Sequence, residues 1–141
     1  YNRMSAKTLY TGDLTSVMSS TSPVSIDGSG VGTWLSEKLG RRPVDVQDTK
    51  LEVVRGAEGR LADGRRVVQL VLRDTAGPLT LIAVSDTTEV IGVKPGGEFC
   101  HAKVESANCV TWVDSGNAFI LMGAREPDQL EAVAQQIRAS E

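Results

Sequence analysis

The middle of the chain contains three β-prone apolar runs separated by turn residues. These runs lie within residues 51–86, and the second run is rich in valine, which favours strands. Asp63-Gly64 precedes the second run and Gly77-Pro78 follows it. Glycine in such short connections adopts the positive φ that tight turns require, and proline fixes its own φ. The pattern therefore predicts three consecutive antiparallel strands.

A second β-prone region lies closer to the C-terminus. Residues 99–104 and 109–113 are apolar and β-prone, and the turn-forming segment 114–117 connects the latter to the apolar run 118–122. We expect a second antiparallel hairpin here. A sheet of this kind cannot bury its apolar face alone, so other segments must cover it.

Helical periodicity near both ends of the chain predicts these covering segments. Apolar residues at positions 10, 14, 17 and 18 share one face of a helix, and residues 31–39 show helical spacing. Near the C-terminus, Pro127 and the acidic residues beside it suit the first turn of a helix. The apolar stripe of that last helix consists of Leu130, Val133, Ala134 and Ile137.

This order of elements predicts an α+β fold. Runs of strands with helices at the ends favour an antiparallel sheet over a doubly wound parallel sheet. We expect about five strands, covered by N-terminal and C-terminal helices. A chain of 141 residues can bury about two thirds of its surface, so residues 1–141 are expected to form a single domain.

The charge balance excludes an electrostatic footprint for nucleic acid or for an anionic membrane. The chain has 15 basic and 18 acidic residues and a formal net charge of -3. No apolar run approaches the roughly 20 residues that a membrane-spanning helix needs. The first residues also lack the succession of basic, apolar and small residues that is typical of a signal peptide. We therefore expect a soluble piece of a longer protein.

Cys100 and Cys109 are the two cysteines of the chain, and they fit neither a C-x-x-C pair nor a zinc spacing. A disulfide between them would close a small loop and stabilise the fold by about 2.7 kcal/mol through chain entropy. Such a bond would suit an oxidising compartment. The alternative is a pair of buried thiols in a cytosolic protein, and we favour the disulfide.

Candidate chemistry is sparse in this sequence. His101 is the sole histidine, so with Cys100 and Cys109 it provides at most three soft ligands, where a structural zinc site generally uses four. The chain has no G-x-S-x-G motif, and the glycines of residues 28–33 lack the lysine of a P-loop. We expect no catalytic residues, no metal and no cofactor, and we expect that the protein is not an enzyme.

Trp34 and Trp112 are large residues that either pack in a core or contact a partner. Packing with a satisfied indole N–H is the favoured interpretation, and a partner or ligand surface is the alternative. The arginine pairs at 41–42 and at Arg65-Arg66 are short. We interpret them as solvated turn charges in preference to an anion site.

Short motifs occur in a consistent order over most of the chain. They lie in the segments 13–17, 19–20, Val31 with 34–39, 42–44, 54–61, 64–72, 78–84, and 109–112 with Gly116 and Phe119. This succession resembles the extracytoplasmic domain of transmembrane anti-sigma factors. In that family a helix with a D-V-x-S-S-like end precedes a V-x-x-W-x-x-x-K-L segment, and a hairpin of the form N-x-V-x-W-x-x-G-x-x-Y precedes the closing helix.

The resemblance implies a single-pass membrane regulator of transcription. A cytoplasmic part that is not in this chain would bind a sigma factor, and an upstream helix would cross the membrane. Residues 1–141 would form a periplasmic sensor domain that responds to a protein or small-molecule signal, with no catalytic residues. We expect the signal to act through the packing of the N-terminal helix. The alternative is a periplasmic small-molecule-binding module that has Trp34 or Trp112 at the mouth of a pocket.

Overall fold

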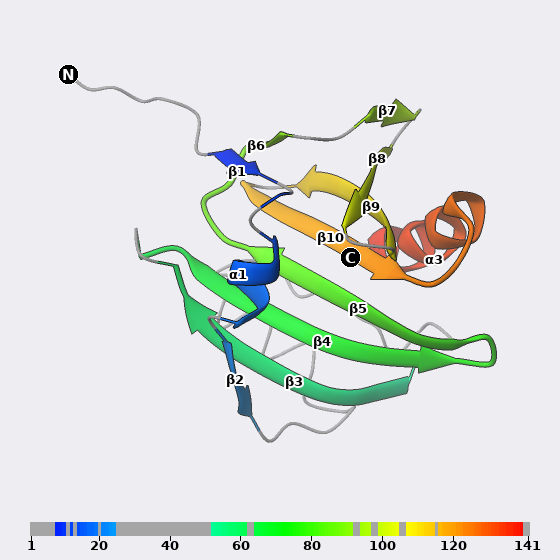
Figure 1. Ribbon diagram of the computed structural model, residues 1–141, viewed down its shortest axis with the longest axis horizontal. Helices are drawn as coiled ribbons and strands as arrows, with labels where there is room; N and C mark the ends of the chain where they lie inside the picture. Colours follow the sequence, from blue (N-terminus) through cyan, green and yellow to red (C-terminus); the bar gives the residue numbers. More distant parts are fainter. Residues whose placement is uncertain are drawn as a thin grey trace.

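A computed structural model of the chain shows a mostly β protein (Figure 1). The structure describes residues 8–10, 12, 14–19, 21–24, 52–61, 64–91, 94–96, 99–104, 107–114 and 116–139. The elements in this part of the chain are β1 (Thr8–Tyr10), α1 (Leu14–Ser19), β2 (Thr21–Val24), β3 (Glu52–Arg60), β4 (Arg66–Asp74), β5 (Gly77–Val84), β6 (Glu89–Ile91), β7 (Lys94–Gly96), β8 (Phe99–Val104), β9 (Ala107–Asp114), β10 (Asn117–Gly123) and α3 (Pro127–Ala139).

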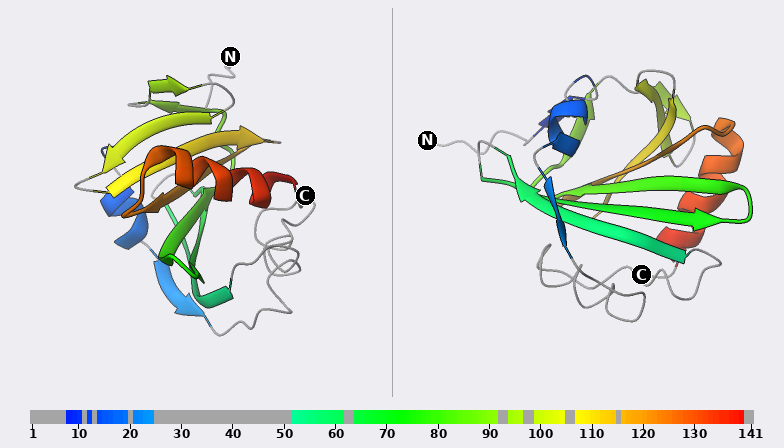
Figure 2. Two further views of the ribbon diagram at one scale, coloured as in Figure 1. Left: turned by 90° about the vertical axis from the view of Figure 1, so that its right-hand side faces the viewer. Right: turned by 60° about the horizontal axis from the view of Figure 1, so that its bottom comes forward.

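The described strands form one large sheet and one small sheet. The large sheet has the order β2-β3-β4-β5-β10-β9-β8-β7, and all of its pairs are antiparallel. Figure 2 shows that this sheet is strongly twisted along that order. The small sheet is the parallel pair of β1 and β6. The predicted antiparallel sheet, with its three consecutive strands β3, β4 and β5 and its hairpin β9–β10, is confirmed.

The expected number of about five strands was too low, because the large sheet has eight strands among the described residues. Two of the missed strands, β2 and β7, lie at the edges of the sheet. They have four and three residues and contain Pro23 and Pro95. Proline cannot donate to a ladder and short edge strands lack a clear period, so the sequence pattern did not reveal them.

Each face of the large sheet has its own buried core. On one face, α3 places Leu130, Val133 and Ala134 against the sheet. On the other face, Leu9 of β1 with Leu14 and Val17 of α1 joins a second cluster. Residues of β4, β5, β9 and β10 point alternately into these two cores, because successive side chains of a strand lie on opposite faces.

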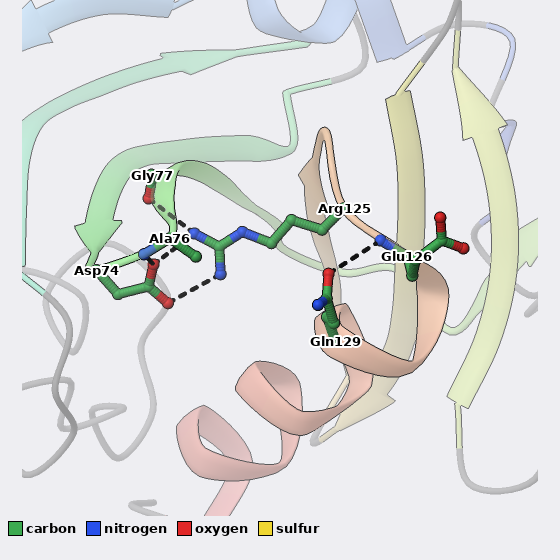
Figure 3. Close-up of polar contacts among 6 residues, drawn as sticks. All are labelled: Asp74, Ala76, Gly77, Arg125, Glu126 and Gln129. Carbon is green, nitrogen blue, oxygen red and sulfur yellow. Dashed lines mark hydrogen bonds and ion pairs between the residues drawn. The ribbon is translucent and has the colours of Figure 1, made fainter.

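The last helix, α3, was correctly predicted from its apolar stripe and its first turn. Pro127 is its first residue, and Glu126 caps it: the amides of Gln129 and Leu130 donate to the Glu126 carbonyl oxygen over 3.0 and 3.1 Å. The amide of Glu126 donates to Oε1 of Gln129 over 3.3 Å, as in a capping box (Figure 3). Leu130, Val133 and Ala134 are buried, whereas the side chain of Ile137 lies outside the described residues.

The N-terminal helix differs from its prediction over residues 10–18. The helical segment α1 has six residues, Leu14–Ser19, and position 10 belongs to β1. Gly12 and the serines and threonines beside it disfavour a longer helix, and pairing of residues 21–24 with β3 continues the chain as a strand. The predicted helix over 31–39 lies outside the described residues. The described chain is therefore mostly β, and the α+β class holds only in the sense of an antiparallel sheet with a C-terminal helix.

Candidate functional site

The two cysteines are free thiols on neighbouring strands, so the predicted disulfide is wrong. In the pairing of β8 with β9, Cys100 lies opposite Thr111 and Cys109 lies opposite Ala102. The cysteines are therefore diagonal neighbours, whose Cα atoms are typically about 7–8 Å apart. The Cα atoms of a disulfide are usually no more than about 6.8 Å apart, so this register does not suit the bond. Burial raises the pKa of the Cys109 thiol to about 11.

Trp112 packs in the core between the sheet and α3, and it is only 6% exposed. Its ring stacks on Phe119 with centroids 5.4 Å apart and meets the edge of Phe99 at 5.6 Å. Trp112 is therefore a core residue, as the packing interpretation expected, but its indole N–H is not satisfied within the described part of the chain, as that interpretation also expected it to be. Its Nε1 is buried and has no hydrogen-bond partner among the described residues. Trp34, the other candidate, lies outside the described part of the chain.

His101 links the sheet to α3. Its Nε2 contacts Oε1 of Glu131, and the two side chains are 27% and 24% exposed. No group of three or more histidine, cysteine or acidic side chains converges within the described residues. The contact joins β8 to the helix that covers its face, which gives His101 a structural role in holding α3.

A polar contact that we call the N-terminal latch attaches β1 to the body of the protein. Nη1 of Arg65 donates to the carbonyl oxygen of Thr8 over 2.8 Å and contacts Oγ1 of Thr87 over 2.9 Å. Thr87 is fully buried, and its amide donates to the carbonyl oxygen of Gly116 over 2.8 Å. The latch consists of Thr8, Arg65 and Thr87. Arg65 is therefore not a solvated turn charge.

A hollow of about 270 Å³ lies at the end of the β3–β4 ladder and is lined by Glu58, Gly59, Arg60, Arg66, Val67 and Val68. Arg60 and Arg66 are directly opposite each other in the ladder. Arg65 and Arg66 are adjacent in the sequence, but Arg66 is the first residue of β4 and Arg65 precedes the strand, and only Arg66 lines the hollow. The predicted hairpin could have indicated this site from the sequence. Arg60 and Arg66 lie on either side of its turn, so the two strands bring them opposite each other. Trp112, one of the two tryptophans that we expected at the mouth of a pocket, does not line the hollow.

The helices of the described region contain no segment that is both long and apolar enough to cross a membrane. Comparison of the chain with protein-family models, with curated proteins and with solved structures yields no match. The function of the chain therefore has to be inferred from its sequence motifs and its geometry.

Proposed function

We propose that this chain is the extracytoplasmic sensory or partner-binding domain of a membrane-anchored anti-sigma factor. In this proposal, an upstream helix crosses the membrane and a cytoplasmic part binds the sigma factor, and neither is in this chain. The domain lies at the periplasmic face of the inner membrane and regulates transcription by binding a protein or small-molecule signal. It acts through binding and carries no catalytic residues.

The observation that supports this proposal best is the way the N-terminal segment is built into the fold. Leu9, Leu14 and Val17 of this segment are buried in the second core. The Arg65 guanidinium holds the β1 backbone at Thr8. In the proposed protein, the N-terminal segment connects the domain to the membrane anchor. A change in the packing of this segment would therefore directly affect the membrane anchor.

Release of the N-terminal segment does not require the large sheet to unfold. Among the described residues, the segment of residues 8–19 contacts the rest of the protein through the parallel pair β1–β6, through the buried side chains of Leu9, Leu14 and Val17, and through the latch. None of the described strands β3, β4, β5 and β10 pairs with residues 8–19. Local opening of such a segment costs less free energy than global unfolding, and a ligand that prefers one state shifts the population toward it. The signal would thus act by stabilising the closed or the open latch.

The test uses the full-length protein with the change Arg65→Ala, which removes the central donor of the latch. Arg55→Ala is the matched control. Arg55 is an exposed arginine on β3, so its replacement removes the same charge without changing the latch. We expect faster amide exchange and faster proteolysis at residues 8–19 in Arg65→Ala, together with altered transcription from a sigma-dependent reporter. The control should behave as the unaltered protein in all three measurements.

Two results would contradict the proposal. One is unchanged transcription in an Arg65→Ala variant whose N-terminal segment exchanges measurably faster, because the latch would then have no regulatory role. The other is a coding sequence upstream of Tyr1 that lacks a membrane-spanning segment, because the domain would then have no anchor to act upon.

A further inference from the structure

Two arginines share one face of the β3–β4 ladder at its hairpin end. The register pairs Arg60 with Arg66 and pairs Glu58 with Val68. Directly opposite residues lie on the same face, and residues two apart on one strand do so as well. These four residues therefore form a single cluster, and they supply four of the six residues that line the hollow.

The hollow has a charged rim and little apolar lining. Val68 lies on the same face of the sheet as Arg60 and Arg66 and is buried, whereas the side chain of Val67 belongs to the core on the other face. Arg60 is exposed and Arg66 is partly exposed, so their guanidinium groups are the polar groups that would fix the orientation of a ligand. The volume of about 270 Å³ is slightly below the range of about 300–1,000 Å³ of drug-sized ligands, so a small ligand fits best.

Hydrogen bonds hold the side chain of Arg60 and the backbone of Arg66 in place. Nη1 of Arg60 donates to the carbonyl oxygen of Gly64 in the hairpin turn over 3.2 Å. The amide of Arg66 donates to Oγ of Ser85 over 2.8 Å, and the Ser85 amide donates to the Arg66 carbonyl oxygen over 3.0 Å. Fixing the backbone of Arg66 and the side chain of Arg60 lowers the ordering cost of binding.

The cluster contains two arginines and one carboxylate, that of Glu58. Like charges directly opposite each other in a ladder are unfavourable. Neither Arg60 nor Arg66 forms an ion pair with a carboxylate of the described residues. An oxyanion between the two guanidinium groups would remove this repulsion and accept hydrogen bonds from both planar forks.

We infer that the hollow binds a small molecule through an oxyanion, either a carboxylate or a phosphate group. Glu58 lines the same hollow as the two arginines. The inference does not depend on the proposed membrane regulator. It concerns binding by this chain, which can be measured without the membrane or the sigma factor.

The experiment measures binding of inorganic phosphate and of acetate to the 141-residue chain by calorimetry, at a constant ionic strength of about 0.15 M. We expect one of these probes to bind with a Kd of about 1 mM or lower, and the tighter probe identifies the group. Arg60→Gln and Arg66→Gln should each weaken binding at least about tenfold. Arg55→Gln is the matched control. Arg55 lies on β3, as Arg60 does, but its side chain is on the opposite face of the ladder, where it pairs with Val71. This control should weaken binding less than about twofold.

Amide chemical shifts of the unaltered chain provide a second measurement that is free of folding effects. The tighter probe should move the amide signals of residues 58–60 and 66–68 more than those of the remaining strands. Three outcomes would overturn the inference: no binding of either probe, equal weakening by Arg55→Gln and by the two cluster variants, or shift changes centred elsewhere.

Discussion

The guanidinium of Arg125 binds the carboxylate of Asp74 through two hydrogen bonds, although the two residues are 51 positions apart in the chain. Asp74 is the last residue of β4, and its Oδ1 also accepts a hydrogen bond from the Ala76 amide over 2.9 Å. Arg125 additionally donates to the Gly77 carbonyl oxygen over 2.8 Å (Figure 3). One arginine before α3 thus ties that helix to the β4–β5 turn.

Loss of this contact should destabilise the fold in a pH-dependent way. Arg125→Ala should lower the free energy of unfolding by about 2 kcal/mol at pH 7, because it removes charged hydrogen bonds and leaves a partly buried carboxylate. The hydrogen bonds from Arg125 hold the pKa of Asp74 below its ordinary value of 3.8. A depressed folded-state pKa stabilises the fold above about pH 4, and this contribution disappears as the pH falls through the lowered pKa.

Urea denaturation from pH 7 down to pH 3 measures this effect. The difference in unfolding free energy between the unaltered chain and Arg125→Ala should be constant above about pH 5 and should shrink below about pH 4. Arg55→Ala, at an exposed position, controls for the loss of one positive charge. A difference that is the same at pH 3 and pH 7 would show that the Asp74 carboxylate does not contribute through its charge.

Trp112 should tolerate phenylalanine far better than alanine. Phenylalanine keeps an aromatic ring beside Phe99 and Phe119 and removes the unpaired Nε1 donor, whose burial is unfavourable. We expect Trp112→Phe to change the free energy of unfolding by less than about 1.5 kcal/mol. Trp112→Ala should lower it by about 3–5 kcal/mol. Denaturation followed by circular dichroism checks both values, and equal losses would indicate that Nε1 has a hydrogen-bond partner.

Gly123 at the end of β10 should not accept a side chain. A Cβ atom at this position would lie 2.8 Å from Cδ2 of Leu79 and 3.7 Å from Cδ2 of Leu130, and both leucines are buried. Gly123→Ala should therefore lower the free energy of unfolding by about 1–3 kcal/mol, because the core has to shift. Gly12→Ala is the control, since a Cβ there meets no atom within 4 Å. Its effect should stay within about 0.5 kcal/mol, and a similar loss in both variants would contradict the steric explanation.

The two thiols should differ strongly in reactivity. In denatured protein that has not been reduced, a thiol reagent should titrate both Cys100 and Cys109, because neither is in a disulfide. In the folded protein at pH 8, Cys109 should react far more slowly, since a pKa of about 11 leaves about one thiolate in a thousand. Cys100, which is partly exposed, should react first. Absence of free thiols in the denatured protein would contradict the structure.

The sequence by itself determined the elements that local chemistry specifies. The glycine turns around β4 and the alternation within β3, β4 and β5 depend on neighbouring residues, as does the 3.6-residue period of α3. These elements were therefore predicted with nearly correct bounds. The same reasoning found the hairpin of β9 and β10 and the burial of Trp112, but not the unpaired state of its Nε1 among the residues that the structure describes.

Only the tertiary structure decided which distant segments meet. The register of β8 against β9 separates Cys100 from Cys109 by a diagonal step, and no local pattern encodes that register. Strand β1 (residues 8–10) pairs with β6 (residues 89–91), which is far away in the sequence. The position of β1 could therefore not be predicted from its sequence neighbours. The tertiary structure likewise decided that Arg65, just before β4, contacts Thr8 and Thr87 in the latch, whereas Arg66, the first residue of β4, lines the hollow. Turns and helical periods depend on neighbouring residues. Long-range strand pairing depends instead on how well side chains from distant segments pack together in the two cores, and this packing cannot be read from local sequence patterns.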